Sequence, residues 1–127
     1  MSKSIEELVK YLIARSKETL EEATLLADGG YWNAVANRLY YSCYYMVAAI
    51  LLKNGHPASS HKVVKTIFHK EFVKSELVSP EAGKLFNRLF NLRQEGDYID
   101  FQKFTQEEIS PFLADVQQFI TEIEKII

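Results

Sequence analysis

The segment from about Trp32 to Asn54 is apolar on nearly every side, and this feature most limits what the chain can fold into. A helix that is apolar all round has to be covered by other elements. Its longest uncharged stretch, Leu39–Leu52, is too short to cross a bilayer. We therefore predict that this segment is the central helix of a bundle, or that it also carries a dimer face.

Amphipathic segments that can cover this helix lie on both sides of it. Apolar residues at three-and-four spacing predict a helix over about residues 5–28, and Gly29-Gly30 ends it because glycine tolerates the left-handed geometry of a helix end. Ser59 or Ser60 is the expected cap of a third helix. No run in the chain shows the alternation of a strand.

Two more helices are expected in the second half of the chain. Ser79-Pro80 is a strong start signal for a fourth helix, which Gly96 is expected to close. Thr105 and Glu108 form a capping box before the last helix. Pro111 either kinks the first turns of that helix or marks its true start.

Short connections between long helices favour antiparallel neighbours. The predicted fold is therefore an all-α, up-and-down bundle of four to five helices, forming a single domain over residues 1–127. A chain of this length buries enough surface to fold without a metal or disulfide, and its lone Cys43 is expected to be a small buried residue. No signal-peptide pattern is visible, so a cytoplasmic location and no membrane partner are expected.

The charge balance argues against one class of function. With 15 basic and 17 acidic residues, the formal net charge is −2, which disfavours non-specific binding of duplex nucleic acid. A local basic cleft remains compatible with this balance. Lys62, Lys65, His69 and Lys70 form a mildly basic stripe, interpreted as a solvated face with RNA contact as the alternative.

The commonest enzyme motifs are absent from the sequence. It has no P-loop, no dinucleotide-binding glycine motif, no nucleophile elbow and no paired-carboxylate signature. His56, His61 and His69 lack the spacing of zinc ligands and are expected at the surface. We predict neither a metal nor a cofactor.

Two arginines stand in otherwise apolar stripes. A guanidinium does not deprotonate, so Arg38 and Arg93 each need an anion or several acceptors if they are buried. One interpretation is a structural network, in which an arginine pairs with Asp97 and Tyr41 or Tyr98 supplies a hydroxyl. The other is a cleft in which both arginines receive a phosphate. These five residues form the candidate ligand-binding set.

Four tyrosines cover two adjacent edges of the central helix: Tyr40, Tyr41, Tyr44 and Tyr45. Tyrosine combines a large apolar area with a polar tip. The set is interpreted as core plus dimer contact, with base stacking as the alternative.

Several runs together carry a family resemblance. The more specific parts are the tyrosine pair that follows an arginine in Arg38–Tyr45, and the Arg-x-x-x-Asp-Tyr motif that ends Leu89–Tyr98. The runs Gly29–Ala34 and Ser60–Val64, with Gly55 and Phe68, extend the match over nearly the whole chain. On these residues the chain resembles the HEPN superfamily, in its branch of small stand-alone bacterial and archaeal proteins.

The resemblance implies a helical bundle that forms a homodimer. Such proteins are frequently encoded beside a minimal nucleotidyltransferase in toxin–antitoxin-like pairs, and the family name implies nucleotide binding. The resemblance therefore implies a nucleotidyltransferase partner and a nucleotide or RNA ligand. The same family context suggests Tyr98 as a target for modification by that partner.

Several HEPN branches are metal-independent ribonucleases that use an arginine followed after four to six residues by a histidine. In such a pair the histidine handles a proton and the arginine stabilises the phosphorane. Here Tyr98, Ile99 and Asp100 stand at those positions after Arg93, so we do not expect ribonuclease activity by that mechanism. The expected function is a nucleotide-binding and interaction module; the alternatives are a ribonuclease toxin with a rearranged site and a purely structural dimer.

Overall fold

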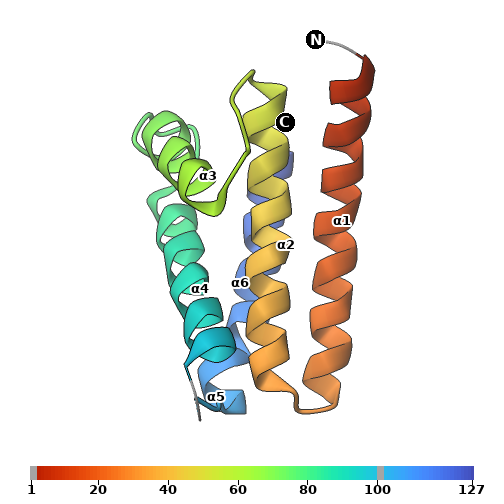
Figure 1. Cartoon of the computed structure of the whole chain (residues 1–127), viewed down its shortest axis with the longest axis vertical. Coiled ribbons are helices and arrows are strands. Elements are labelled where there is room, and N and C mark those ends of the chain that lie inside the picture. The colour runs from red at the N-terminus through yellow and green to blue at the C-terminus, as the bar shows by residue number, and fades with distance from the viewer. Residues whose placement is uncertain (1–2, 100–101) are drawn as a thin grey trace.

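Helices account for most of the chain in the computed structural model, which describes residues 3–99 and 102–127. Four long helices alternate in direction, with shorter helical segments between them (Figure 1). No strand occurs in the described ranges, so the prediction of an all-α, up-and-down bundle is confirmed. The elements are α1 (Lys3–Asp28), α2 (Trp32–Lys53), α3 (His61–Ile67), the π-helix η1 (Phe68–Val73), α4 (Pro80–Tyr98), α5 (Gln106–Ile109) and α6 (Pro111–Glu124).

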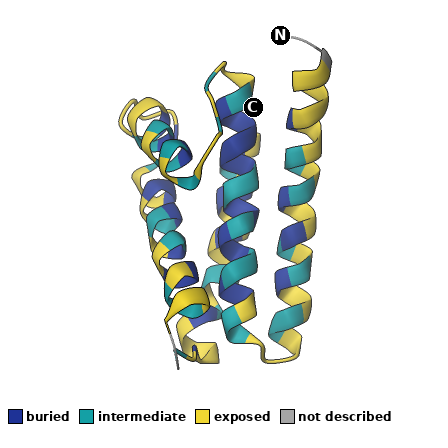
Figure 2. Cartoon of the chain, viewed as in Figure 1, coloured by how far each residue is buried: buried dark blue, intermediate teal, exposed yellow. Residues whose placement is uncertain are grey.

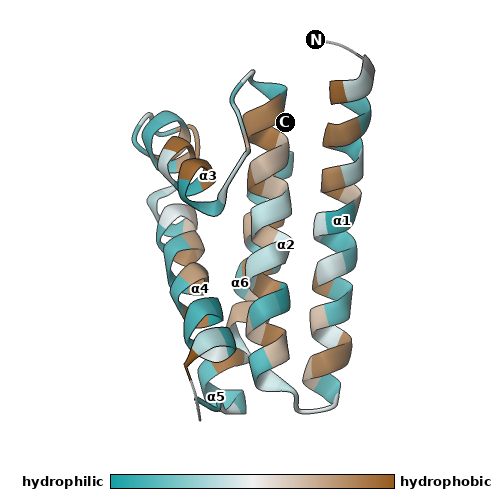
Figure 3. Cartoon of the chain, viewed as in Figure 1, coloured by the Kyte–Doolittle hydropathy of each residue, from teal (hydrophilic) through white to brown (hydrophobic). Residues whose placement is uncertain are grey.

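Helix α2 is the central element, as its apolar sequence predicts. It packs against α1, α4 and α6, and buried residues follow it along most of its length (Figure 2). Its polar residues gather near its first turns, and the later turns are more apolar (Figure 3). No helix within the described residues is long and apolar enough to span a membrane.

Side chains cap the helices where the sequence signals predict. Gly30 ends α1 with a positive φ of 79°, which glycine adopts without strain. Ser60 accepts a hydrogen bond from the Val63 amide and Ser79 accepts one from the Ala82 amide. Thr105 forms the predicted capping box at the start of α5.

Two details of the second half differ from or sharpen the predictions. Gly96 does not close α4, which continues to Tyr98. A Cβ on Gly96 would lie 2.9 Å from a ring carbon of Phe104, so this glycine permits close packing rather than ending the helix. Pro111 begins α6 after the short helix α5, which settles the two alternatives for this proline in favour of a separate start.

A reciprocal pair of hydrogen bonds fixes α1 against α2. The Ser16 hydroxyl donates to the Ser42 carbonyl over 2.6 Å, and the Ser42 hydroxyl donates to the Ser16 carbonyl over 2.8 Å. Both serines are fully buried, so all four polar atoms of the pair are satisfied inside the bundle. The neighbouring Cys43 is fully buried as predicted, and burial raises the pKa of its thiol.

The end of α4 is held by one side chain of α2. The Asn33 amide nitrogen lies 2.8 Å from the Gln102 carbonyl and 3.4 Å from the Gly96 carbonyl. Its amide oxygen accepts a hydrogen bond of 2.8 Å from the Phe104 backbone. This clamp sets where the last turn of α4, and with it Tyr98, lies against α2.

Candidate functional site

Arg93 lies inside the bundle among aromatic rings. Its exposed fraction is 5%, and its guanidinium carbon lies 5.1 Å from the centre of the Tyr40 ring. The rings of Tyr41, Phe90 and Tyr98 lie at 5.6, 5.7 and 5.6 Å. Nη1 donates a hydrogen bond of 3.2 Å to the Tyr98 hydroxyl. We call Arg93 and these four rings the Arg93 box.

The charge in the Arg93 box has no acidic partner. No carboxylate oxygen of a described residue lies within 4.0 Å of the guanidinium. Nε is buried and has no hydrogen-bond acceptor within the described part of the chain. Each ring face stabilises a desolvated cation by about 0.5–2 kcal/mol, but a ring centre does not replace the acceptor that Nε lacks. The box thus holds a buried positive charge whose Nε has no acceptor among the described residues.

His61 lies beside the same rings, although it is far from Arg93 in the sequence. Its Nδ1 is 2.7 Å from the Tyr40 hydroxyl, and its ring centre is 4.6 Å from that of Tyr44. Burial lowers the pKa of His61, and the charge of Arg93 lowers it further. Neutral imidazole is therefore the favoured form near pH 7.

All three histidines are partly buried, so the expectation that they lie on the surface is wrong. The first turn of α3 packs on the tyrosine edge of α2, so His61 is partly buried there. His56 and His69 are half-buried as well. Burial also raises the pKa of Tyr40, against the opposing effect of Arg93, so the hydroxyl that faces His61 stays protonated.

Arg38 is paired with an acid, but not with the predicted one. Its Nη1 donates to Glu22 of α1 over 3.1 Å, and its Nε and Nη2 donate to the Asn37 side chain over 3.1 and 2.8 Å. The Arg38 side chain is 25% exposed. Its guanidinium carbon lies 5.4 Å from the Tyr41 ring, which Arg93 also contacts. Tyr41 is therefore shared by both arginines.

Asp97 pairs with neither arginine, which corrects the predicted network. It is exposed on the last turn of α4 and accepts a hydrogen bond of 2.8 Å from the Asn37 amide. The Arg93 side chain instead enters the ring cluster, where the predicted hydroxyl partner Tyr98 is confirmed. The structure thus brings Tyr41, Arg93 and Tyr98 together and leaves Asp97 outside. The part of these residues in ligand binding stays a prediction.

Sequence reasoning missed Phe90 and the contact of His61 with the tyrosines. Phe90 reads as one more apolar residue of an amphipathic helix, and nothing in its spacing marks it as a neighbour of Arg93. His61 belongs to α3 and Arg93 to α4, so no local motif links them. The only available signal was the Ser60 cap, which makes His61 the first residue of its helix.

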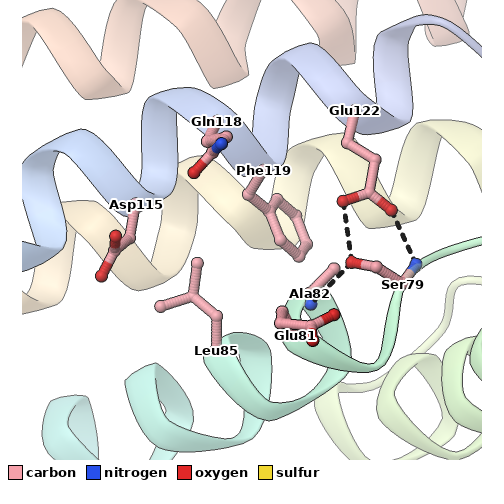
Figure 4. A pocket seen from close by; sticks show the side chains of 8 residues that line it. All are labelled: Ser79, Glu81, Ala82, Leu85, Asp115, Gln118, Phe119 and Glu122. Atoms are coloured by element: carbon pink, nitrogen blue, oxygen red, sulfur yellow. Dashed lines mark hydrogen bonds between the residues drawn. The ribbon is translucent and has the colours of Figure 1, made fainter.

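Away from the Arg93 box, a hollow of about 500 Å³ lies between α4 and α6 (Figure 4). Its carboxylate Glu122 accepts hydrogen bonds from the Ser79 amide and hydroxyl over 2.7 and 2.9 Å. A carboxylate at a helix N-terminus is favourable because of the free amides there. Glu122 therefore ties α6 to the start of α4. Over the described residues, no group of three or more His, Cys, Asp or Glu side chains could hold a metal ion.

The comparisons with known proteins agree with the bundle. The HEPN domain family model matches residues 9–126. A "UPF0332 protein" of Thermotoga maritima is 36% identical over 122 residues, covering 96% of this chain and 92% of the relative. A protein of Methanocaldococcus jannaschii whose name reads "putative toxin" is 29% identical over 114 residues, covering 90% of this chain and 78% of the relative.

Proposed function

Because this chain belongs to the HEPN domain family, we propose that it is a nucleotide-binding and interaction module that works with a nucleotidyltransferase partner in a toxin–antitoxin-like pair. The archaeal relative named as a toxin supports the toxin–antitoxin half of the proposal. The nucleotide half places a ligand phosphate at the Arg93 box. Tyr41 and Tyr98 border that phosphate and offer ring faces to a base.

The observation that carries the nucleotide half is the unpaired state of Arg93. The residue is 5% exposed, its guanidinium has no carboxylate partner among the described residues, and Nε has no acceptor there. An unsatisfied buried donor costs about 1–3 kcal/mol, and a phosphate oxygen would supply the missing acceptor with a charge-assisted bond. Arg38, by contrast, already has its acceptors in Glu22 and Asn37.

Calorimetry with AMP and ATP tests this half. The wild-type protein is expected to release or absorb heat on titration, and Arg93→Ala is expected to remove the signal. Arg88→Ala is the matched control, because Arg88 is an exposed arginine of the same helix. Circular dichroism of each variant separates lost binding from lost folding. Absence of heat with the wild-type protein rejects nucleotide binding.

The partner half has its own test. A minimal nucleotidyltransferase encoded beside this gene is expected to co-purify with the chain when the two are expressed together. Analytical ultracentrifugation of the chain alone tests the expected homodimer. A neighbouring nucleotidyltransferase that does not bind would contradict the pairing while leaving nucleotide binding open to the calorimetric test.

The position of His61 favours a second candidate function, a metal-independent ribonuclease with a rearranged site. His61 and Arg93 both contact the rings of Tyr40 and Tyr41, so a histidine and an arginine lie close together without the sequence motif. A neutral imidazole can take the proton of a 2′-hydroxyl as that oxygen attacks phosphorus, while a guanidinium stabilises the phosphorane charge and the 5′-oxygen leaves.

Incubation of the purified protein with RNA, with and without chelator, tests this candidate. Cleavage that survives the chelator and is lost in both Arg93→Ala and His61→Ala would favour it over simple binding. His56→Ala is the matched histidine control, since His56 lies against Phe72 and outside the Arg93 box. Intact RNA after prolonged incubation with folded wild-type protein would reject the ribonuclease candidate.

A further inference from the structure

A groove runs along α3 and η1 on the outside of the bundle. It has a volume of about 750 Å³ and is lined by Lys62, Lys65, Thr66, His69, Lys70, Val73 and Lys74. Residues three and four apart share one side of a helix, which is why these side chains line a single groove. We call it the α3 groove.

The α3 groove is a concentration of positive charge on a chain whose formal net charge is −2. Four of its lining residues are lysines and none is acidic. Over the described residues, no carboxylate lies within 4.0 Å of any of these four ammonium groups, whereas Lys17 of α1 is paired with Glu124 at 2.6 Å. The charge of the groove is therefore available to an external anion.

The α3 groove leads to the Arg93 box through one aromatic ring. The Lys65 ammonium lies 4.8 Å from the centre of the Phe90 ring, and the Arg93 guanidinium carbon lies 5.7 Å from the same centre. His61, one turn before Lys65 on α3, contacts the Tyr40 hydroxyl of the box. Tyr98, which is 69% exposed, adds an accessible ring beside Arg93.

We propose that the α3 groove binds the backbone of a single-stranded polynucleotide, one of whose phosphates occupies the Arg93 box. This inference rests on the proposed nucleotide binding and extends it from a free nucleotide to a strand. A basic groove with aromatic rings at its end is the arrangement that binds single strands, because every unpaired base has a face that stacks on a ring. A duplex hides those faces, so a single strand fits the ring-ended groove better.

The test compares two double variants that remove the same charge. Lys70→Gln with Lys74→Gln removes two lysines of the α3 groove, and Lys10→Gln with Lys125→Gln removes two exposed lysines of other elements. Fluorescence anisotropy measures binding of labelled twelve-nucleotide oligo(U) and oligo(dT) over a series of salt concentrations. The two oligonucleotides separate RNA from DNA as the source of the strand.

We expect the groove variant to bind the preferred strand roughly 10- to 30-fold more weakly at 0.1 M salt, with a salt slope smaller by about 1.4. The control variant is expected to bind like the wild type. AMP binding, measured by calorimetry, is expected to be unchanged in the groove variant and about 10- to 100-fold weaker in Arg93→Met.

Three results would overturn the inference. Equal strand binding by the groove variant and the wild type would show that the strand does not bind in the groove. Equal losses of affinity in the groove and control variants would show that only the overall charge of the protein matters. A poly-glutamate peptide that binds the groove more tightly than either oligonucleotide assigns it to an acidic protein partner. Failure of AMP to bind the wild type is a separate result: it rejects the Arg93 phosphate site, and the lysine comparison still decides the groove.

Discussion

Arg38 and Arg93 occupy comparable places in the sequence and opposite situations in the fold. Arg38 lies at the partly exposed edge of α2, where Glu22 and Asn37 accept hydrogen bonds from its guanidinium. Arg93 lies inside the bundle on α4, among rings. Among the described residues, its guanidinium has one hydrogen-bond partner, Tyr98, and its Nε has none. Both arginines contact the Tyr41 ring.

The two arginines therefore differ in hydrogen bonding: Arg38 has its acceptors within the protein, whereas Arg93 lacks one. A surface pair such as Arg38 with Glu22 contributes about 0.2–1 kcal/mol, and its loss leaves solvated groups. A buried cation without an anion costs stability, which four ring faces only partly restore. Arg93 is therefore held at an energetic disadvantage, which is what the proposed phosphate site would use and a structural bridge would not need.

Replacing each arginine by methionine is the strongest test of the difference between Arg38 and Arg93. Arg93→Met is expected to weaken AMP binding by about 10- to 100-fold, since a hydrogen bond to a charged group contributes about 1.5–3 kcal/mol. Its free energy of unfolding is expected to stay level or rise by about 1–3 kcal/mol, because methionine removes an unsatisfied buried charge. Arg38→Met is expected to bind AMP within about threefold of wild type.

Calorimetry and urea unfolding of the two variants provide these values. A loss of stability above about 2 kcal/mol in Arg93→Met, with AMP binding retained, would show that the ring contacts of Arg93 are structural. That result would reverse the assignment of the two arginines.

The Tyr40 hydroxyl tests how firmly His61 is held beside the Arg93 box. Tyr40→Phe removes its hydrogen bond to Nδ1 of His61 and is expected to lower the free energy of unfolding by about 0.5–1.5 kcal/mol. Tyr45→Phe is the matched control, because the described residues show no hydrogen bond from that half-buried hydroxyl. Urea unfolding at pH 7 measures both; equal effects would mean that the Tyr40–His61 bond adds nothing.

The pH dependence of stability tests the burial of His61 beside the Arg93 box. Its pKa in the folded protein is below the ordinary value, so between that lowered pKa and about 6.5 the unfolded chain binds more protons than the folded one. The stability gained by keeping His61 neutral in the folded protein is fully present above about pH 6.5 and is lost as the pH falls toward the folded pKa. Stability is therefore expected to rise with pH through this window.

Chemical unfolding at a series of pH values between 5 and 8 checks this prediction. His61→Gln is expected to flatten the part of the curve that belongs to this histidine, and His56→Gln to leave that part in place. The same curve in wild type and His61→Gln would contradict the burial of His61.

The smallest effect is expected at Asp97, which the sequence analysis had paired with an arginine. Asp97 is exposed and bonds only to Asn37 among the described residues, so Asp97→Ala is expected to change the free energy of unfolding by less than about 0.5 kcal/mol. Thermal melting beside Glu22→Gln, which removes the acid that Arg38 does use, provides the reference. A loss of several kcal/mol at Asp97 would restore the predicted buried pairing.

Local sequence signals predicted the bundle well because they act over a few residues. The caps at Ser60, Ser79 and Thr105 stand where the helices begin, and Gly30 stands where α1 ends. The prediction that Gly96 closes α4 was wrong, because glycine is also used where two segments approach closely. Here the close neighbour is Phe104. Which of the two uses applies depends on a residue that is distant in the chain.

The candidate site was predicted in its members but not in its pairings. The sequence named Tyr98 and Tyr41 as possible hydroxyl partners of an arginine, and in the structure the Tyr98 hydroxyl accepts a hydrogen bond from Arg93. It assigned Asp97 to an arginine, whereas the direction of each side chain on α4 sends Arg93 toward the rings and Asp97 toward Asn37. It placed His61 at the surface, because α3 reaches the tyrosine edge only through the packing of the whole bundle.

By itself, the sequence determined that this chain forms helices, where most of them begin and end, and that α2 lies at the centre. Those properties follow from hydrophobic periodicity and from hydrogen bonds within a few residues. Only the tertiary structure decided which arginine has an acidic partner and which lies among rings, because pairing depends on the register between helices rather than on spacing along one helix. A guanidinium carries the same charge in both places, and its neighbours across the bundle decide what that charge can do.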